Sequence, residues 1–264
     1  MTMNLKLDDK LSLVSGSTAG IGYAIAEALA QEGARVIVNG RSQESVDNAV
    51  SSIKSNTGGK VFSFAGDLAT DAAAHQLARQ FPNVEILVNN LGIYEHKVFE
   101  DILDEDWRRF FEVNVLSGVR LSRLFLSGMR SRNWGRIIFI SSESAVQIPT
   151  GMIHYGMTKI AVLAVSRGLA EAVAGTGITV NSVLPGPTKS RGVIAMDSLA
   201  KFEGKSFDKF EKEFFEKHRP TSLIKRFAAP EEVASLVVYI ASPLASATTG
   251  AALRVDGGVI KSAF

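Results

Sequence analysis

Cysteine is absent from the 264 residues of this chain. Disulfide bonds, thiolate metal sites and a cysteine nucleophile are therefore excluded, and we expect no metal site. Long apolar runs are also missing, since none approaches the roughly 18 residues of a membrane-spanning helix. Residues 1–10 are polar and lack the apolar core of a secretion signal. We therefore expect a cytoplasmic protein without membrane contacts.

The chain also has little excess charge of either sign. Lys and Arg number 29 against 27 Asp and Glu, and they form no basic stripe, so binding to nucleic acid is not indicated. What the chain has in quantity is apolar side chains, which make up 46% of it and can fill a large core. No repeat or linker divides the sequence. We expect residues 1–264 to form a single domain.

Strand-like and helix-like segments alternate along most of the sequence. Such alternation predicts an α/β fold with a doubly wound parallel sheet of the Rossmann type. We expect about seven strands, with helices on both faces of the sheet. A helix capped by Asp104 is predicted through about residue 129, and another over about 160–174. The predicted strands cover residues 11–14, 34–39, 60–65, 84–88, 137–140, 177–184 and 253–255.

A glycine-rich stretch separates the first predicted strand from its helix. It reads Ser15-Gly16-Ser17-Thr18-Ala19-Gly20-Ile21-Gly22. Such a turn lets the backbone approach a pyrophosphate, which then sits on the helix N-terminus. The glycine spacing differs from the common G-x-G-x-x-G pattern, and a plain tight turn is the alternative. The position between strand and helix favours a dinucleotide site.

The end of the second predicted strand bears on the choice of cofactor. A carboxylate there suits the ribose 2′-hydroxyl of NAD, whereas an arginine suits the 2′-phosphate of NADP. The chain has Arg41 and Ser42 at this point and no acid before Glu44. Both side chains can donate to a phosphate. We expect NADP(H) to be preferred with NAD(H) possible, the alternative being that Arg41 is a solvated loop residue.

The stretch from Ser141 to Lys159 carries the chemistry. It follows the strand over 137–140, at the sheet edge where α/β proteins bind ligands. Tyr155 and Lys159 are four residues apart and share one helix face. A nearby ammonium lowers the pKa of a phenol, which can then exchange a proton with a carbonyl or alcohol oxygen. Taken alone, the pair could equally be solvated.

The segment over about 188–220 has a different pattern, in which charges alternate with aromatic residues. Phe207, Phe210 and Phe214 follow helical spacing, so we predict one or two amphipathic helices that form a substrate lid. A surface excursion with a small core of its own is the alternative. Tyr94, Met152 and His154 could complete the pocket wall. The aromatic lid predicts a substrate with apolar bulk beside its carbonyl.

Together these motifs resemble the short-chain dehydrogenase/reductase family over nearly the whole chain. Ser142 lies thirteen positions before the tyrosine, as in the family, and is therefore preferred to Ser141. Three departures are Ser15 for the usual threonine, Leu91 for the usual alanine, and Ala19 where members that use NADP often carry a basic residue. The matching residues are Gly16, Gly20, Gly22, Asp67, Asn89, Asn90, Gly92, Asn114, Ser142, Tyr155, Lys159, Pro185, Gly186, Asp256, Gly257 and Gly258.

The resemblance implies a mechanism of hydride transfer between NADP(H) and a carbonyl or alcohol substrate. Tyr155 would be the general acid and base, and Ser142 would hold the substrate oxygen. Lys159 would bind the nicotinamide ribose and lower the pKa of the tyrosine, and Asn114 would anchor a water that links Lys159 to solvent. The further cofactor contacts would be Ser17, Thr18, Ile21, Asp67 at the adenine, Leu68, Asn89 at the adenosine ribose, Gly92, Pro185, Gly186 and Thr188 near the nicotinamide amide.

The family also implies a homotetramer, in which the helices over about 104–129 and 153–174 pack against symmetry mates, and a dimer is the alternative. A protein that binds NADP(H) as a sensor without turnover is the other functional hypothesis. The complete set of Ser142, Tyr155, Lys159 and Asn114 argues against it, because a sensor does not need these groups.

Overall fold

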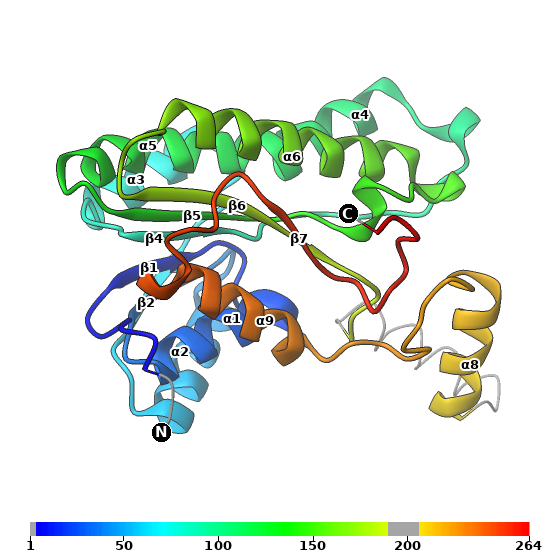
Figure 1. Cartoon of the computed structure of the whole chain (residues 1–264), viewed down its shortest axis with the longest axis horizontal. Coiled ribbons are helices and arrows are strands. Elements are labelled where there is room, and N and C mark those ends of the chain that lie inside the picture. The colour runs from blue at the N-terminus through cyan, green and yellow to red at the C-terminus, as the bar shows by residue number, and fades with distance from the viewer. Residues whose placement is uncertain (1–3, 190–205, 264) are drawn as a thin grey trace.

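A single parallel sheet forms the centre of the structure, a computed structural model that describes residues 4–189 and 206–263. Its strands lie in the order β3-β2-β1-β4-β5-β6-β7 (Figure 1). The predicted α/β fold is confirmed, and strand ends differ from the predicted ones by at most two residues. The strands are β1 (Leu11–Val14), β2 (Arg35–Gly40), β3 (Val61–Ala65), β4 (Ile86–Asn89), β5 (Gly135–Ile140), β6 (Ile178–Pro185) and β7 (Ala252–Val255).

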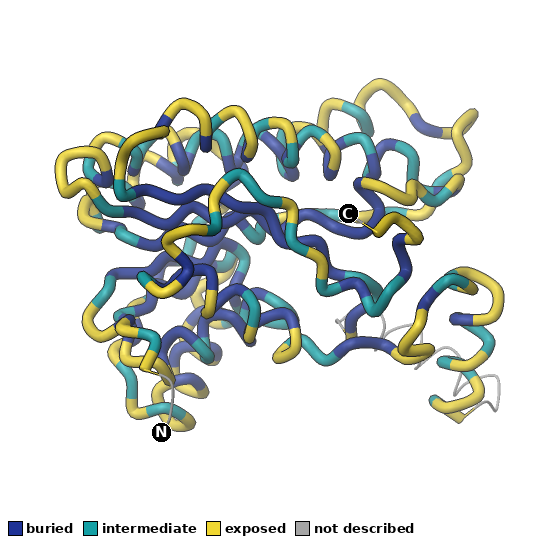
Figure 2. Tube along the Cα trace, in the orientation of Figure 1, coloured by how far each residue is buried: buried dark blue, intermediate teal, exposed yellow. Residues whose placement is uncertain are grey.

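Helices cover both faces of the sheet. On one face lie α1 (Gly20–Gln31), α2 (Gln43–Thr57) and α9 (Pro230–Ala241), and on the other lie α3 (Asp71–Gln80), α5 (Ser117–Ser131) and α6 (Ile153–Ala172) (Figure 1). Each face has its own apolar cluster. The strands β1, β5 and β6 are buried throughout (Figure 2), which agrees with their mostly apolar sequences, and the few polar residues within them are buried as well.

The helix expected over 104–129 is interrupted. It consists of α4 (Asp104–Phe111), a π-helical segment η2 (Glu112–Leu116) and α5. Asp104 is not its cap, because Leu103 holds the cap position and donates its backbone N–H to Asp106 at 3.1 Å. Neither proline nor glycine marks the break, so the pattern of apolar residues could not reveal it. Such π segments are common at functional sites, and this one contains Asn114.

The helix that follows β5 begins earlier than the predicted residue 160. Two short turns, η3 (Glu143–Ala145) and η4 (Thr150–Met152), lead from β5 into α6, which starts at Ile153. Tyr155 therefore lies in the first turn of α6 and Lys159 in the second. Both residues are held by regular helix rather than by a loop.

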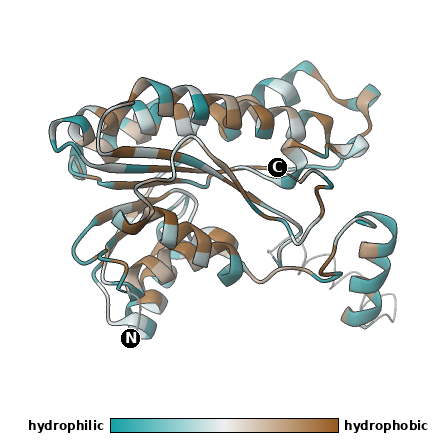
Figure 3. Cartoon of the chain, in the orientation of Figure 1, coloured by the Kyte–Doolittle hydropathy of each residue, from teal (hydrophilic) through white to brown (hydrophobic). Residues whose placement is uncertain are grey.

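The helix α8 (Phe207–Lys217) stands off the sheet at the end of the molecule (Figure 1). Figure 3 shows it as mixed apolar and polar, in contrast to the apolar strands. Its Phe210 and Phe214 pack on Phe227, with ring centroids 6.1 and 4.8 Å apart. The amphipathic helix predicted at 207–214 is thus present, while the part of the predicted lid at 190–205 lies outside the described residues.

Across residues 4–189 and 206–263, no helix is both long and apolar enough to cross a membrane.

Candidate active site

A cavity of about 750 Å³ opens at the carboxyl ends of the central strands. This is the edge where open α/β sheets bind their ligands. Its walls come from segments far apart in the sequence, namely the β1–α1 turn, the ends of β4, β5 and β6, the start of α6, and α8. The residues that we predicted for the site and that line this cavity are Ile21, Gly92, Ser142, Tyr155, Lys159, Pro185, Gly186 and Thr188.

The glycine turn before α1 is shaped as an anion cradle. Gly16 has a φ of +62°, which favours glycine, and a Cβ on Gly22 would lie 2.4 Å from the Gly16 carbonyl oxygen. The N-terminus of α1 has no side-chain cap and no acid in its first turn, whereas α2 and α3 have both. Backbone N–H groups at this end are therefore free of side-chain acceptors, so the turn fits the pyrophosphate of a dinucleotide.

Two asparagines that sequence reasoning did not assign a role hold this turn in place. Asn39, at the end of β2, accepts from the backbone N–H of Gly16 at 3.1 Å. Asn90, just after β4, donates to the carbonyl oxygens of Ser15 and Gly16 at 2.9 and 3.0 Å. The Ser15 hydroxyl accepts from the N–H groups of Asn90 and Leu91, both at 3.0 Å. The sequence signal that could have identified these two asparagines is a polar residue at the end of a buried strand.

The end of β2 lies beside the turn. A Cβ on Gly40 would be 2.5 Å from the Thr18 methyl group, so only glycine permits this approach. Arg41 follows on the surface with an exposed side chain. Ser42 caps α2, since its hydroxyl accepts from the Ser45 N–H at 3.3 Å. Ser17 is likewise engaged, because its hydroxyl donates to the Val14 carbonyl at 2.7 Å. A phosphate contact by Ser42 would compete with its capping role.

Three further predicted cofactor contacts lie outside the cavity. Asp67 is exposed and accepts from the Ala69 N–H at 3.1 Å, and Leu68 is fully buried, so only its backbone can reach a ligand. The side chain of Asn89 donates to Ser122 of α5 at 3.2 Å, while its neighbour Asn90 lines the cavity. The expected contact of Asn89 with the adenosine ribose stays a prediction.

The two serines after β5 have different partners. The Ser141 hydroxyl donates to the backbone carbonyl of Lys159 at 2.9 Å and so ties β5 to α6. The Ser142 hydroxyl accepts from the Ser144 N–H at 3.1 Å and hydrogen-bonds the Tyr155 phenol. This geometry agrees with the choice of Ser142 as the group beside the tyrosine.

The pKa of Tyr155 departs from the expected direction. Burial raises it to about 12, while the hydrogen bond with Ser142 opposes the rise. The Lys159 ammonium lies 5.5 Å from the centre of the Tyr155 ring and is not among the groups that cause this shift. Burial therefore dominates the pKa of Tyr155 in this structure, and the lowering by Lys159 stays a prediction.

Lys159 is itself buried, and its ammonium donates to the Ile140 carbonyl at 3.0 Å. Burial lowers its pKa to about 8. A Cβ on Gly92 would lie 3.4 Å from the Lys159 nitrogen, so the glycine leaves room beside the ammonium. A ligand oxygen could approach from the cavity side.

Asn114 supports this arrangement from behind. Its amide oxygen accepts from the Ile93 N–H at 2.8 Å, and its amide nitrogen donates to the Ile93 carbonyl and to Thr158, both at 3.0 Å. The side chain therefore links the loop after β4 to α6. These contacts give Asn114 a structural role, while its role as the anchor of a water molecule stays a prediction.

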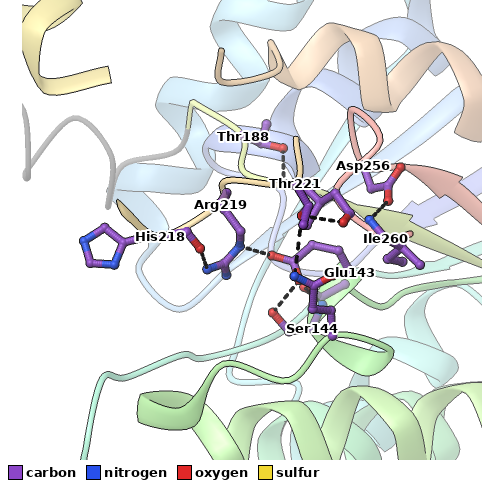
Figure 4. A network of polar contacts seen from close by, with 12 residues as sticks. Glu143, Ser144, Thr188, His218, Arg219, Thr221, Asp256 and Ile260 are labelled. Carbon is purple, nitrogen blue, oxygen red and sulfur yellow. Dashed lines mark hydrogen bonds and ion pairs between the residues drawn. The ribbon is translucent and has the colours of Figure 1, made fainter. Parts of the chain in front are cut away.

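A buried ion pair at the cavity wall was not anticipated. Arg219, two residues after α8, donates from its Nε to the Glu143 carboxylate at 2.7 Å (Figure 4). Burial raises the pKa of Glu143, and the Arg219 charge opposes the rise. The two residues are 76 positions apart, so no local pattern in the sequence could have paired them.

The predicted wall residues divide into two groups. Tyr94 and Met152 line the cavity together with Phe210 and Phe214 of α8. His154 does not, because its ring is fully buried and lies 4.1 Å from that of Phe110. The expectation for His154 is therefore wrong. Its neighbour Tyr155 lines the cavity, so these adjacent helix positions point in different directions.

No group of three or more His, Asp or Glu residues that could hold a metal ion occurs within the described part of the chain.

Comparisons with known proteins agree on one family. The family model described as Enoyl-(Acyl carrier protein) reductase matches residues 16–260. The uncharacterized oxidoreductase YvaG of Bacillus subtilis (strain 168) is 47% identical, with 99% of this chain and 100% of that protein covered. The 3-oxoacyl-[acyl-carrier-protein] reductase FabG of Aquifex aeolicus (strain VF5) is 33% identical, with 97% and 100% covered.

A solved structure extends this agreement to the fold. The L-sorbose reductase of Gluconobacter frateurii, complexed with NADPH and L-sorbose, superimposes with a TM-score of 0.91 at 34% identity, and the match covers 98% of this chain and 100% of that one. Dehydrogenase/reductase SDR family member 4 of Caenorhabditis elegans is 33% identical over 96% of both chains. The chain belongs to the short-chain dehydrogenase/reductase family of oxidoreductases.

Proposed function

We propose that the protein is an NADP(H)-dependent carbonyl reductase. The observation that carries the proposal is that Ser142, Tyr155 and Lys159 line one cavity, together with Asn90, which holds the glycine turn. A ketone in that cavity would lie between the tyrosine and the cofactor. The similar L-sorbose reductase, whose structure contains NADPH and a sugar, supports the same reading.

Each protein group has a definite task in this reaction. Bound NADPH supplies the hydride to the carbonyl carbon. Ser142 donates to the carbonyl oxygen and fixes its position. Tyr155 gives its phenolic proton to the same oxygen as negative charge develops there. The Lys159 ammonium binds ribose hydroxyls and stabilises the tyrosinate that remains.

The raised pKa of Tyr155 keeps its phenol protonated near neutral pH. A phenol with a pKa of about 12 is protonated at pH 7 and ready to donate. Oxidation of an alcohol needs the phenolate, which becomes more abundant only as the pH rises.

Preference for NADPH rests on Arg41. Its exposed guanidinium follows β2 beside the glycine turn, and no carboxylate lies between it and the turn that could bind a ribose 2′-hydroxyl. An arginine presents several donors that match a phosphate. NAD(H) lacks this phosphate and would gain nothing from Arg41, so it would serve as a weaker cofactor.

The helix α8 would form part of a lid over the cavity of the single domain, and it is the part of the predicted lid that lies within the described residues. Phe210 and Phe214 turn towards the cavity, and charged residues such as Lys212 and Glu216 lie exposed on the outer side. A lid of this kind excludes water from the reacting carbonyl. Its aromatic rings favour a substrate with apolar bulk on that side.

We further propose a cytoplasmic homotetramer, with a dimer as the alternative. Apolar residues stay exposed on the helices that would form the contacts, including Phe111 at 39% and Ile160 at 44%. Tyr239 and Leu244 are exposed to a similar extent near α9, on the other side of the sheet. Two separate faces would be needed for a tetramer.

The direct test is oxidation of NADPH, followed by its absorbance, with a broad panel of ketones and with NADH in parallel. We expect turnover with at least one class of ketone and faster turnover with NADPH. Tight NADPH binding without turnover of any ketone would refute the reductase and favour the sensor hypothesis. Faster turnover with NADH would refute the cofactor assignment alone.

A further inference from the structure

Glu143 is a buried carboxylate in the wall of the reaction cavity. Only 4% of its side chain is exposed, yet it lines the cavity directly after Ser142. Carboxylates are seldom buried so fully without a task, because removing their charge from water is costly. The mechanism above uses neither Glu143 nor its partner Arg219.

The partners of Glu143 leave part of its hydrogen-bonding capacity unused. Arg219 donates to one carboxylate oxygen at 2.7 Å, and the Ser144 hydroxyl donates to the other at 3.1 Å. An ionised carboxylate can accept about four hydrogen bonds in all. Each oxygen can therefore take one more donor, and Glu143 is one of the residues that line the cavity.

The contacts also fix the carboxylate in place. Arg219 is held in turn by its bond to the His218 carbonyl at 2.9 Å (Figure 4). Thr221, two residues further on, donates to the Val259 carbonyl at 2.6 Å, which anchors this segment to the C-terminal part of the chain. A rigid acceptor discriminates between ligands better than a mobile one.

Glu143 lies close to the reacting group. It follows Ser142 directly in the chain and lines the same cavity as Ser142 and Tyr155. A ligand oxygen bound by Tyr155 and Ser142 would thus have the Glu143 carboxylate as a neighbour. Phe210 and Phe214 of α8 bring apolar rings to the cavity wall, next to Glu213 and Lys217 of the same helix.

Resting on the proposed reductase function, we propose that Glu143 is a specificity-determining residue that selects ketones with a hydroxyl close to the reacting carbonyl, as in an α-hydroxyketone. The substrate hydroxyl donates to the carboxylate that Arg219 and Ser144 hold. A ketone without that hydroxyl would leave the carboxylate with an unused acceptor facing an apolar group, which disfavours its binding. The substrate class is therefore a hydroxylated ketone with an apolar or extended remainder.

The test compares two matched pairs of substrates, acetone with hydroxyacetone and acetophenone with α-hydroxyacetophenone. For each pair the quantity measured is the ratio of kcat/KM for the hydroxylated ketone to that for its parent ketone. Glu143→Gln should lower this ratio by roughly threefold to tenfold, because the neutral amide oxygen still accepts but forms a weaker hydrogen bond than the carboxylate. Effects of the variant on Tyr155 or on the fold act on both members of a pair and cancel in the ratio.

Glu95→Gln is the matched control. Glu95 also lines the cavity and is also paired with an arginine, Arg109, at 2.9 Å, but its side chain is 42% exposed. This variant should keep the parental ratio. An equal ratio in the parent and Glu143→Gln, or an equal decrease in both variants, would overturn the inference.

The unmodified enzyme provides a measurement that does not depend on any variant. It should prefer the hydroxylated member of each pair, and reduction of both members with equal kcat/KM would overturn the inference even if Glu143→Gln did not fold. These results leave the reductase function intact. Failure to reduce any ketone would instead refute that function and the inference together.

Discussion

Replacing Tyr155 with phenylalanine removes the proton donor and little else. Burial raises the pKa of this phenol to about 12, so the parent donates from a neutral hydroxyl at pH 7. Ser142 loses the phenol as a partner but still accepts from the Ser144 N–H at 3.1 Å, so the free energy of unfolding should fall by only about 0.5–1.5 kcal/mol. Loss of proton transfer should slow reduction by about 10²–10⁴-fold. That corresponds to about 2.7–5.5 kcal/mol in the activation barrier.

The assay is single-turnover oxidation of NADPH with saturating ketone, and the affinity for NADPH is measured separately by fluorescence. Tyr94→Phe is the control, because Tyr94 also lines the cavity and its ring lies 6.4 Å from that of Tyr155 in an edge-on arrangement. It should retain most of the rate. A near-parental rate for Tyr155→Phe, or equal losses in both variants, would refute the reasoning.

Four other predictions concern the cofactor, pH, assembly and lid. Arg41→Ala should weaken NADPH binding by roughly tenfold or more, since a hydrogen bond to a charged group contributes about 1.5–3 kcal/mol; an equal loss for NADH would contradict this. The kcat/KM for reduction should stay constant near neutral pH and decline as the pH rises through about 8, where Lys159 loses its charge. The absence of this decline in the parent, or the same decline in Lys159→Met, would contradict the role given to Lys159. Light scattering should show a tetramer, and a stable monomer at micromolar concentration would end that proposal. Hydrogen exchange within α8 should slow when NADPH and an alcohol product bind together, whereas equal protection in both states would make α8 fixed scaffold.

The sheet and its ligand edge could be predicted because their signals are local. Each buried strand is a continuous apolar run, and the small polar or glycine residues that follow it mark its end. The positions of Ser142, Tyr155 and Lys159 on neighbouring elements follow from that order. Strand ends were predicted to within two residues, and the helix that carries Tyr155 and Lys159 begins at Ile153, as its expected role in the tetramer assumed, although its apolar-rich part was expected only from residue 160.

Features that depend on distant contacts could not be predicted. The pairing of Glu143 with Arg219 and the clamp of Asn39 on Gly16 join residues from different elements. The direction of the Asn89 side chain could not be predicted, because a residue at a strand end can face either side of the sheet. The burial that raises the pKa of Tyr155 could not be predicted either, because the sequence shows the nearby lysine but not the depth of burial.

The clamp around the glycine turn has a consequence for folding. The turn belongs to the first β–α unit, yet its shape requires Asn90, which takes its place only once β4 has docked beside β1. Contacts of this kind close long loops and form late, at a cost in chain entropy. A nascent chain that ends before Asn90 would therefore lack a formed cofactor site. NADPH would bind the completed sheet and not its precursors, so cellular cofactor at a hundred times its Kd would add about 2.7 kcal/mol to the stability of the finished fold. Depletion of the cofactor would then lower the amount of folded enzyme as well as its rate.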